Sequence, residues 1–307
     1  MEHRDRRLER CSVLGPWPLR LALETDSFSL DFELKRIALG VQYDGTPWQG
    51  WQTQLSGNTV QDRLQAALKK FAQADITTTC AGRTDTGVHA LEQVVHFDTA
   101  LERESFSWVR GLNAYLPPSI AVRWATEVAH DPAAELQARE FHARFSARSR
   151  TYHYALYNHP VRSPLLTGKV GWVYRPLVLE AMQAAAACLI GHHDFSAFRS
   201  ADCQAKSPLK KMHEIRIERR GDLIIFTIHA SAFLHHMVRN IIGSLIYTGI
   251  GRHPPEWMKS VLIGRDRNLA APTFMPDGLY LAKVDYDTKW GLPQEEAPVL
   301  PWLTARG

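Results

Sequence analysis

The sequence predicts an α+β protein in which two successive strand–helix–strand halves build one broad sheet. A chain of 307 residues is long enough for two halves of ordinary domain size. Its composition, 45% hydrophobic and 22% charged, is typical of a globular protein. Short β-rich segments alternate with amphipathic helical segments, and the cycle then repeats. We therefore expect helices on one face of the sheet and a cleft on the other.

The first half spans residues 35–140 and opens with a strand at 37–43. Thr59 has the side chain of a helix cap, and Asp62 follows in the first turn, where the helix dipole favours a negative charge. The apolar residues that follow have helical spacing and form one stripe: Val60, Leu64, Ala67, Leu68 and Phe71. The other elements expected in this half are strands at 76–80, 94–97 and 120–127 and a helix at 105–114.

The second half spans residues 141–290. Pro176 is expected to open a helix that runs to Ile190, and Gly191 to close it. Alternating apolar residues on either side of a polar turn predict a hairpin. The elements expected here are strands at 152–157, 212–218, 223–229 and 279–284, with further helices at 234–248 and 257–263.

Three segments lie outside this pattern. Residues 1–34 begin with an arginine-rich stretch like that of a signal peptide, but prolines and an arginine interrupt the apolar run that should follow. We interpret this segment as a flexible N-terminal extension or as a translation start assigned too early. Residues 128–140 are polar and alanine-rich, which predicts an exposed insertion. The Pro-rich residues 291–307 are expected to form a loose tail.

Composition narrows the class of protein. The net charge of +4 and the pI near 8.9 permit a polyanionic partner without requiring one. No run of 18 apolar residues occurs, so no membrane span is expected. The four cysteines lie far apart and form no CxxC, which predicts reduced thiols in a cytoplasmic protein rather than a zinc site or a disulfide framework. They are Cys11, Cys80, Cys188 and Cys203.

The most informative segment is the ten-residue string 81–90, Ala-Gly-Arg-Thr-Asp-Thr-Gly-Val-His-Ala. Asp85 lies between two threonines, with Arg83 two positions before it. Gly82 and Gly87 allow the positive φ or close approach that a tight loop needs. Taken alone, the Gly-Arg-Thr-Asp core fits a surface turn with an incidental ion pair as well as it fits a loop that holds a charge against a ligand.

The whole string resembles the active-site loop of the tRNA pseudouridine synthase A (TruA) family, whose usual form is Gly-Arg-Thr-Asp-Ala-Gly-Val-His. Thr86 replaces the alanine, and we expect the added hydroxyl to be tolerated. Arg150 stands where the family often has lysine, which keeps the charge. Across about residues 35–290 further motifs occur in the family's order: 43–46, 50–54, 59–61, 141–147, 152–154, 191–195 and 233–240.

The resemblance implies a pseudouridine synthase fold, with two RRM-like or ferredoxin-like halves in a continuous, mostly antiparallel sheet and a central cleft. It implies isomerisation of uridine to pseudouridine at positions 38, 39 and 40 of the tRNA anticodon stem-loop by a homodimer without cofactor or metal. The catalytic residues carried over are Asp85, Tyr152 and Arg239, while Arg83 and Tyr152 would bind the substrate.

This chemistry needs an ionised carboxylate in a dry pocket that receives a flipped-out nucleotide. An arginine close by lowers a carboxyl pKa by roughly 1–3 units. From the residues alone, Arg83 and Arg239 are both candidates for the partner of Asp85. The family assigns the salt bridge to Arg239 and the nucleotide contact to Arg83. We therefore expect Asp85 and Arg239 to meet at the floor of the cleft, with Tyr152 lining the same pocket.

Other features have simpler interpretations. The pairs His192-His193 and His235-His236 are not expected to bind a metal, because neighbouring side chains on a helix point about 100° apart. Arg216, Arg219 and Arg220 fit either a phosphate-binding stripe or a solvated strand face. Trp48, Trp51 and Phe71 are expected in the core.

Two other functions remain open at this point. One is a catalytically silent RNA-binding protein made of two RRM-like halves, which would have no need to bring Asp85, Arg239 and Tyr152 together. The other is an acid–base hydrolase that pairs Asp85 with Asp194 at a defined separation. The residues also leave open whether Asp85 attacks C6, attacks C1′ or removes a proton.

Overall fold

The computed structural model describes residues 34–128, 140–293, 298 and 300. The interpretations of the N-terminal extension, of the insertion between 129 and 139 and of most of the tail fall outside these residues. The described residues belong to one compact unit. Within the described part, no helix is long and apolar enough to cross a membrane.

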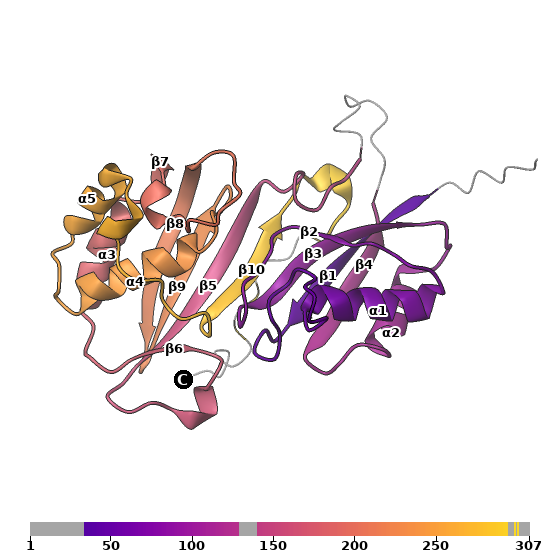
Figure 1. Cartoon of the computed structure of the whole chain (residues 1–307), viewed down its shortest axis with the longest axis horizontal. Helices are drawn as coiled ribbons and strands as arrows, with labels where there is room; N and C mark the ends of the chain where they lie inside the picture. The colour runs from indigo at the N-terminus through magenta and orange to yellow at the C-terminus, as the bar shows by residue number, and fades with distance from the viewer. Residues whose placement is uncertain (1–33, 129–139, 294–297, 299, 301–307) are drawn as a thin grey trace, which may run out of the picture. The chain divides into compact units, whose positions relative to one another are not determined.

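The elements follow the predicted alternation of strands and helices (Figure 1). The strands are β1 (Lys35–Tyr43), β2 (Thr79–Cys80), β3 (His89–Thr99), β4 (Ile120–Glu127), β5 (Ser149–Asn158), β6 (Gly171–Val173), β7 (Gly191–Asp194), β8 (Leu209–Arg220), β9 (Leu223–Ala230) and β10 (Leu279–Asp285). The α-helices are α1 (Val60–Ala72), α2 (Ser105–Asn113), α3 (Leu179–Ala187), α4 (Met237–Gly249) and α5 (Trp257–Gly264).

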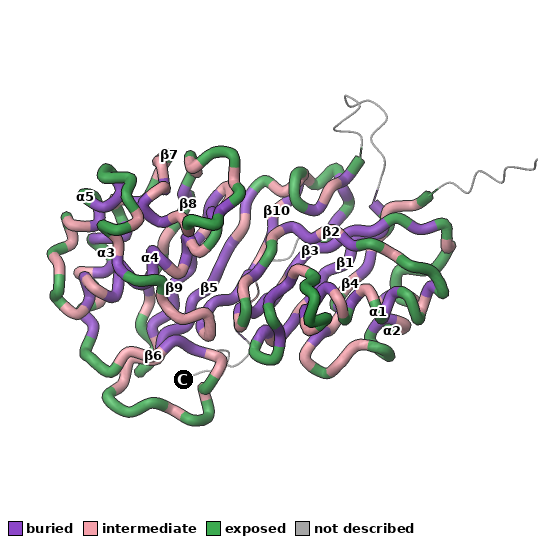
Figure 2. The backbone as a smooth tube through the Cα atoms, viewed as in Figure 1, coloured by how far each residue is buried: buried purple, intermediate pink, exposed green. Residues whose placement is uncertain are grey.

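One sheet runs through both halves in the order β4-β1-β3-β10-β5-β9-β8-β7, with β2 beside β3 and β6 beside β5. Neighbours along this order pair antiparallel except β3 and β10, which are parallel through Tyr280 opposite His89 and Leu281 opposite Ala90. The last strand of the chain thus joins the first half to β5 of the second. The expectation of a continuous, mostly antiparallel sheet is confirmed, and its central strands are largely buried (Figure 2).

Helix α1 forms for the reasons that its sequence indicates. The Thr59 hydroxyl accepts a hydrogen bond from the backbone N–H of Asp62, which caps the first turn. The predicted stripe faces the core, and its last member, Phe71, packs edge-on against Trp108 of α2 at 5.2 Å between ring centroids. Trp48 and Trp51 are buried, as expected.

The second half departs from the prediction at a helix boundary. Helix α3 begins at Leu179 rather than at Pro176, because the backbone N–H of Val178 donates to the carbonyl of Gly249 at the end of α4. Gly191 does not close this helix but begins β7 with φ of +109°. Strands β6 and β7 were not predicted, because at three and four residues they are too short for a periodic pattern.

The expectation of helices on one face and a cleft on the other is wrong. Tyr152, Tyr154 and Leu156 alternate along β5 and therefore share one face of the sheet. Tyr154 and Leu156 belong to the core cluster that includes residues of α1 and α4, whereas Ala155 packs on the opposite face in a separate cluster. Tyr152 lines a cavity to which both halves of the chain contribute. The cavity therefore opens on the helix-bearing face, where α1 and α4 both lie in front of the sheet (Figure 1).

Candidate active site

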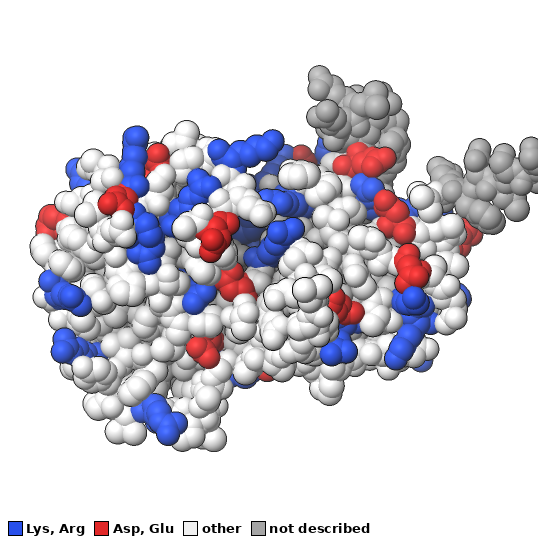
Figure 3. Space-filling model, in the orientation of Figure 1, with Lys and Arg blue, Asp and Glu red and all other residues white. Residues whose placement is uncertain are grey.

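A cavity of about 1000 Å³ lies between the two halves. The first half contributes segments 49–54 and 77–88, and the second contributes 202–207 and 232–239. Lys and Arg side chains gather around the hollow on the face that Figure 3 shows. Asp85 and Asp202 are the carboxylates among the described lining residues, and the cations outnumber them: Arg83, Arg144, Arg150, Lys206, Lys210 and Arg239. Such a wall suits a polyanion.

The loop that carries Asp85 joins β2 to β3. Strand β1 and the segment that follows it support this loop through hydrogen bonds. The hydroxyls of Tyr43 and Thr84 are 2.7 Å apart, and the backbone N–H of Trp51 donates to the carbonyl of Thr84 at 3.0 Å. Gly50 has φ of +83°, and a Cβ there would lie 2.7 Å from that carbonyl oxygen. A glycine is therefore required for the support to approach the loop this closely.

The two glycines of the loop have different functions. Gly87 has φ of +79°, as expected for the turn that leads into β3. Gly82 does not have a positive φ. Its backbone is fixed by the buried amide of Gln93, whose Nε2 donates to the Gly82 carbonyl at 2.5 Å and whose Oε1 accepts from the Gly82 N–H at 3.3 Å. Gln93 was not predicted as part of the site, because the strand pattern shows it only as a polar residue inside β3.

The expected ion pair between Asp85 and Arg239 is confirmed. Arg239 Nη1 lies 3.0 Å from Asp85 Oδ2, although 154 positions separate the two residues. The Arg239 Nε–H donates to the carbonyl of Phe274 at 2.8 Å, which fixes the guanidinium. The side chains are only 14% and 24% exposed, so the pair is largely hidden from solvent. Arg83 instead lies exposed at the edge of the cavity, in position to meet a ligand.

The prediction that His235 and His236 point apart is wrong. Helix α4 begins at Met237, so neither histidine lies in the helix. His236 has φ of +61°, a left-handed conformation that brings both rings to the same side at 4.0 Å between centroids. His235 Nε2 is 3.2 Å from Asp85 Oδ1, and His236 Nε2 is 3.2 Å from Asp85 Oδ2. The catalytic candidate thus has imidazoles beside both carboxylate oxygens.

Tyr152 lines the same cavity from the middle of the sheet. Its ring packs edge-on against Phe233 at 5.0 Å between centroids, which fixes its orientation. Burial raises the pKa of its phenol, so the hydroxyl remains protonated at neutral pH. The side chain is therefore both a strand aromatic and a cavity wall, with an uncharged donor at its tip.

Arg150 is a structural residue of the site whose role the sequence analysis did not assign. Its guanidinium donates to the carbonyls of Ala81, Arg144 and Ser231, which belong to three separate segments around the cavity. Burial lowers its pKa from the ordinary arginine value, but the group stays charged. Arginine can hold several carbonyls at once because its donors form a planar fork.

Other candidates lie elsewhere. Asp194 is in β7 at the far edge of the sheet, accepts hydrogen bonds from Ser196 and lies 3.5 Å from Arg265, so the structure does not bring it to Asp85. On β7, His192 and His193 point to opposite faces. Of the arginines on β8, Arg216 and Arg220 lie beside glutamates of the same strand and Arg219 donates to the Leu177 carbonyl, which favours a solvated strand face.

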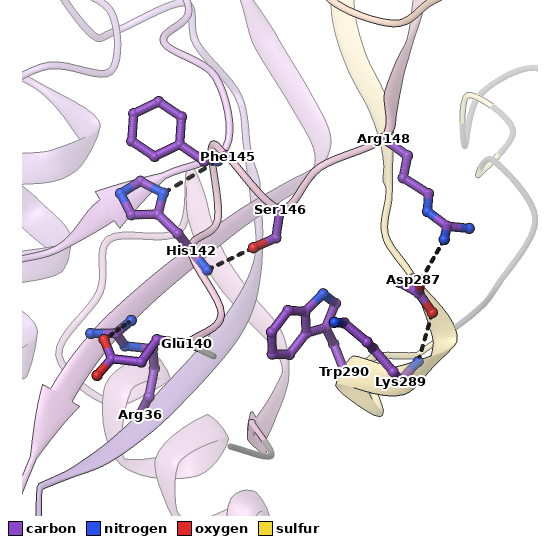
Figure 4. A pocket seen from close by; sticks show the side chains of 9 residues that line it. All are labelled: Arg36, Glu140, His142, Phe145, Ser146, Arg148, Asp287, Lys289 and Trp290. Carbon is purple, nitrogen blue, oxygen red and sulfur yellow. Dashed lines mark hydrogen bonds and ion pairs between the residues drawn. The ribbon is translucent and has the colours of Figure 1, made fainter. Parts of the chain in front are cut away.

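A second hollow of about 390 Å³ lies around the segment that follows residue 140 (Figure 4). Four of its charged groups pair within the protein, Arg36 with Glu140 and Arg148 with Asp287, and the ammonium of Lys289 lies over the ring of Trp290. The backbone N–H of His142 donates a hydrogen bond to the hydroxyl of Ser146 in the same segment. The hollow is therefore less suited to binding a charged ligand than the central cavity.

Comparison with known proteins gives one consistent result. The family model described as tRNA pseudouridine synthase matches residues 40–146 and 185–287. A tRNA pseudouridine synthase A of Herminiimonas arsenicoxydans is 72% identical over 87% of this chain and 96% of its own length. The proteins of that name from Janthinobacterium sp. (strain Marseille) and Paraburkholderia xenovorans are 69% and 58% identical, each over 88% of this chain and over 98% and 97% of their own lengths. The matched motifs and these relatives together place the chain in the tRNA pseudouridine synthase A family.

Proposed function

We propose that this protein isomerises uridine to pseudouridine in tRNA and that Asp85 is the catalytic carboxylate. In this reaction the bond from C1′ to N1 breaks, the uracil turns, and a bond from C1′ to C5 forms. The proton on C5 leaves and N1 gains a proton, so atoms and electrons balance without a cofactor. The observation that carries the proposal is the meeting of Asp85, Arg239 and Tyr152 in one cavity from three distant segments.

Each side chain has a chemical task in this proposal. Arg239 orients the carboxylate of Asp85, which it contacts at 3.0 Å through a charge-assisted hydrogen bond. The target nucleotide must leave its stack to reach the cavity, and the ring of Tyr152 offers a surface on which the uracil can stack. Arg83, exposed at the edge, contacts the flipped nucleotide or its phosphates.

The geometry supports this function over the two alternatives. A silent RNA-binding protein would keep the cationic wall but has no use for a carboxylate held at the bottom of it, where it repels phosphate. A hydrolase that uses Asp85 with Asp194 would need the two carboxylates to face one water. Asp194 lies instead in β7, the strand at one edge of the sheet.

The target uridines and the assembly state are further parts of the proposal. We infer that the enzyme acts as a cytoplasmic homodimer at positions 38, 39 and 40 of the anticodon stem-loop. The family motifs support this inference, as do the cations around the cavity, which suit a folded polyanion. Three of the cysteines, Cys80, Cys188 and Cys203, are free thiols, as in a reducing compartment.

A tRNA transcript labelled with tritium at C5 of uridine tests the proposal, since isomerisation releases the label to water. We expect the wild-type chain to release tritium and Asp85→Asn to release none above background. Asp202→Asn is the matched control because it removes the other carboxylate of the same cavity. Equal loss in both variants, or label release by Asp85→Asn, would contradict the role of Asp85. Substituting uridines 38, 39 and 40 with cytidine one at a time identifies the target positions.

Binding of the same transcript gives an independent measurement. The affinity should fall steeply as salt rises, because each phosphate contact releases condensed counterions. A log–log plot without a negative slope would show that the cations of the cavity do not contact the RNA backbone.

A further inference from the structure

We propose that Asp85, His235 and His236 form a binding site for a divalent transition-metal ion of the zinc class, and that this ion inactivates Asp85 when it binds. The binding of the ion is independent of the reaction catalysed, whereas the effect on turnover rests on the proposed function. The site would make the enzyme sensitive to free zinc rather than dependent on it.

The ligand geometry supports the site. One carboxylate oxygen and two imidazole nitrogens are offered, and all three ligand atoms lie within 4.8 Å of one another. In tetrahedral zinc coordination, bonds of about 2.0–2.1 Å place neighbouring ligand atoms about 3.3 Å apart. His235 Nε2 lies 3.2 Å from Oδ1 and His236 Nε2 lies 3.2 Å from Oδ2, so each imidazole is at about this separation from a different oxygen of the carboxylate. On binding, the side chains rotate to bring one carboxylate oxygen and both imidazole nitrogens to the ion.

The kind of ion follows from the ligand set. Two imidazoles and one carboxylate suit Zn²⁺, Cu²⁺, Ni²⁺ or Co²⁺, whereas Mg²⁺ prefers oxygen ligands and retains its waters. Three protein ligands leave a fourth position for water, and all three residues line the cavity. The magnesium that accompanies tRNA would therefore not compete effectively for this site.

Arg239 affects how strongly the metal ion binds to Asp85. It lies 3.0 Å from Asp85 Oδ2, so the ion can approach from the side of Oδ1 and His235 while Arg239 continues to orient the carboxylate. Its positive charge opposes the ion, and we expect weaker binding than at a structural zinc site. Once the ion holds Asp85, the carboxylate can neither attack the nucleotide nor remove a proton from it.

Titration of the intact protein with Co²⁺ tests the binding, since tetrahedral Co²⁺ has intense visible absorption. We expect one Co²⁺ per chain, displaced by Zn²⁺, and at least a tenfold loss of affinity in His235→Gln, in His236→Asn and in Asp85→Asn. Asparagine is chosen at position 236 because it tolerates the left-handed backbone. His192→Gln, which removes an exposed histidine of the other pair, should leave the affinity unchanged.

Absence of saturable absorption would overturn the proposal, as would unchanged affinity in any of the three site variants or loss of affinity in His192→Gln. Thermal unfolding of each variant separates lost ligands from a lost fold. For turnover, Zn²⁺ should inhibit pseudouridine formation, and a chelator that binds zinc but not magnesium should restore it. Full turnover with the site saturated, or inhibition by the chelator alone, would overturn the inhibitory role. Metal binding by a protein that never forms pseudouridine would contradict the proposed function and not the site.

Discussion

Two aspartates of the first half each reach a cation of the second half, and their surroundings differ in an instructive way. Asp44 pairs with Lys169 and accepts two hydrogen bonds from Thr46, at 3.1 Å from its N–H and 2.7 Å from its hydroxyl. Asp85 pairs with Arg239, and the carboxylate also lies beside two imidazoles on the wall of a cavity.

The difference in function between these two aspartates does not come from deeper burial of Asp44. Its side chain is the more exposed, with 38% accessible against 24% for Asp85. They differ in how completely the chain occupies the carboxylate. Burial alone would raise the pKa of Asp44, but the hydrogen bonds from Lys169 and Thr46 outweigh it and bring that pKa to about 2. A carboxylate fixed by its own chain serves the fold, whereas one with a free approach from a cavity is available for chemistry.

Replacing each aspartate with asparagine should give the largest difference between the two sites, in reaction rate and in stability. Asp85→Asn is expected to lower the rate of pseudouridine formation by on the order of 10³-fold or more, since removal of a group that reacts directly has effects of this size. Affinity for tRNA should stay within a few-fold, because phosphate contacts supply most of it. Asp44→Asn should keep the rate and lose about 1 kcal/mol of unfolding free energy. Single-turnover kinetics and urea denaturation measure both quantities, and an equally slow Asp44→Asn would refute the contrast.

Replacing the two cations, Arg239 and Lys169, with alanine should give a smaller difference in stability and activity between the two sites. Arg239→Ala leaves Asp85 without its guanidinium partner, and we expect a loss of about 2 kcal/mol, between roughly 0–1 for an exposed pair and 3–5 for a fully buried one. Activity should be lost with it, while Arg239→Lys should retain part of both. Lys169→Ala is the matched control, with a loss of at most about 1 kcal/mol and normal activity. If the Lys169 variant were the less stable of the two, the partly buried pair would not be the stronger one.

The smallest effect concerns the histidine beside Asp44. The Gly45 N–H donates to His89 Nδ1 at 3.0 Å, the same nitrogen lies 3.1 Å from Asp44 Oδ1, and Nε2 lies 3.0 Å from the Asp277 carbonyl oxygen. Burial lowers its pKa, with Asp44 as a smaller opposing influence. The unfolded chain therefore binds more protons, and the unfolding free energy should fall as pH falls below 6.5.

His89→Gln should make this pH dependence shallower without abolishing it. His96, whose pKa burial lowers to about 4, contributes in the same pH range. Urea denaturation at pH 7, 6 and 5 measures the slope for the wild type and the variant. An unchanged slope would mean that His89 is not held neutral by the fold.

Local sequence determined the elements that have a strong pattern and the loop that carries the chemistry. The stripe from Val60 to Phe71 and the cap at Thr59 are sufficient to define α1, because both signals lie within a few turns. The short strands β6 and β7 could not be found in this way, since their stability comes from the neighbouring strands β5 and β8. The side on which the cavity opens was likewise not predictable, because it depends on which face of β5 the helices cover.

The sequence by itself determined the reactive carboxylate and two candidate cations, since the string from Gly82 to His89 contains Asp85 and Arg83 and a later motif contains Arg239. The family resemblance favoured Arg239, and the structure shows that pair. Tertiary structure alone decided which other groups join them. The sheet brings Asp85 to α4, and the left-handed turn at His236 directs two adjacent imidazoles to one carboxylate, contrary to helical spacing. A backbone angle at one residue cannot be inferred from periodicity, because periodicity describes regular elements and this turn lies just before one begins.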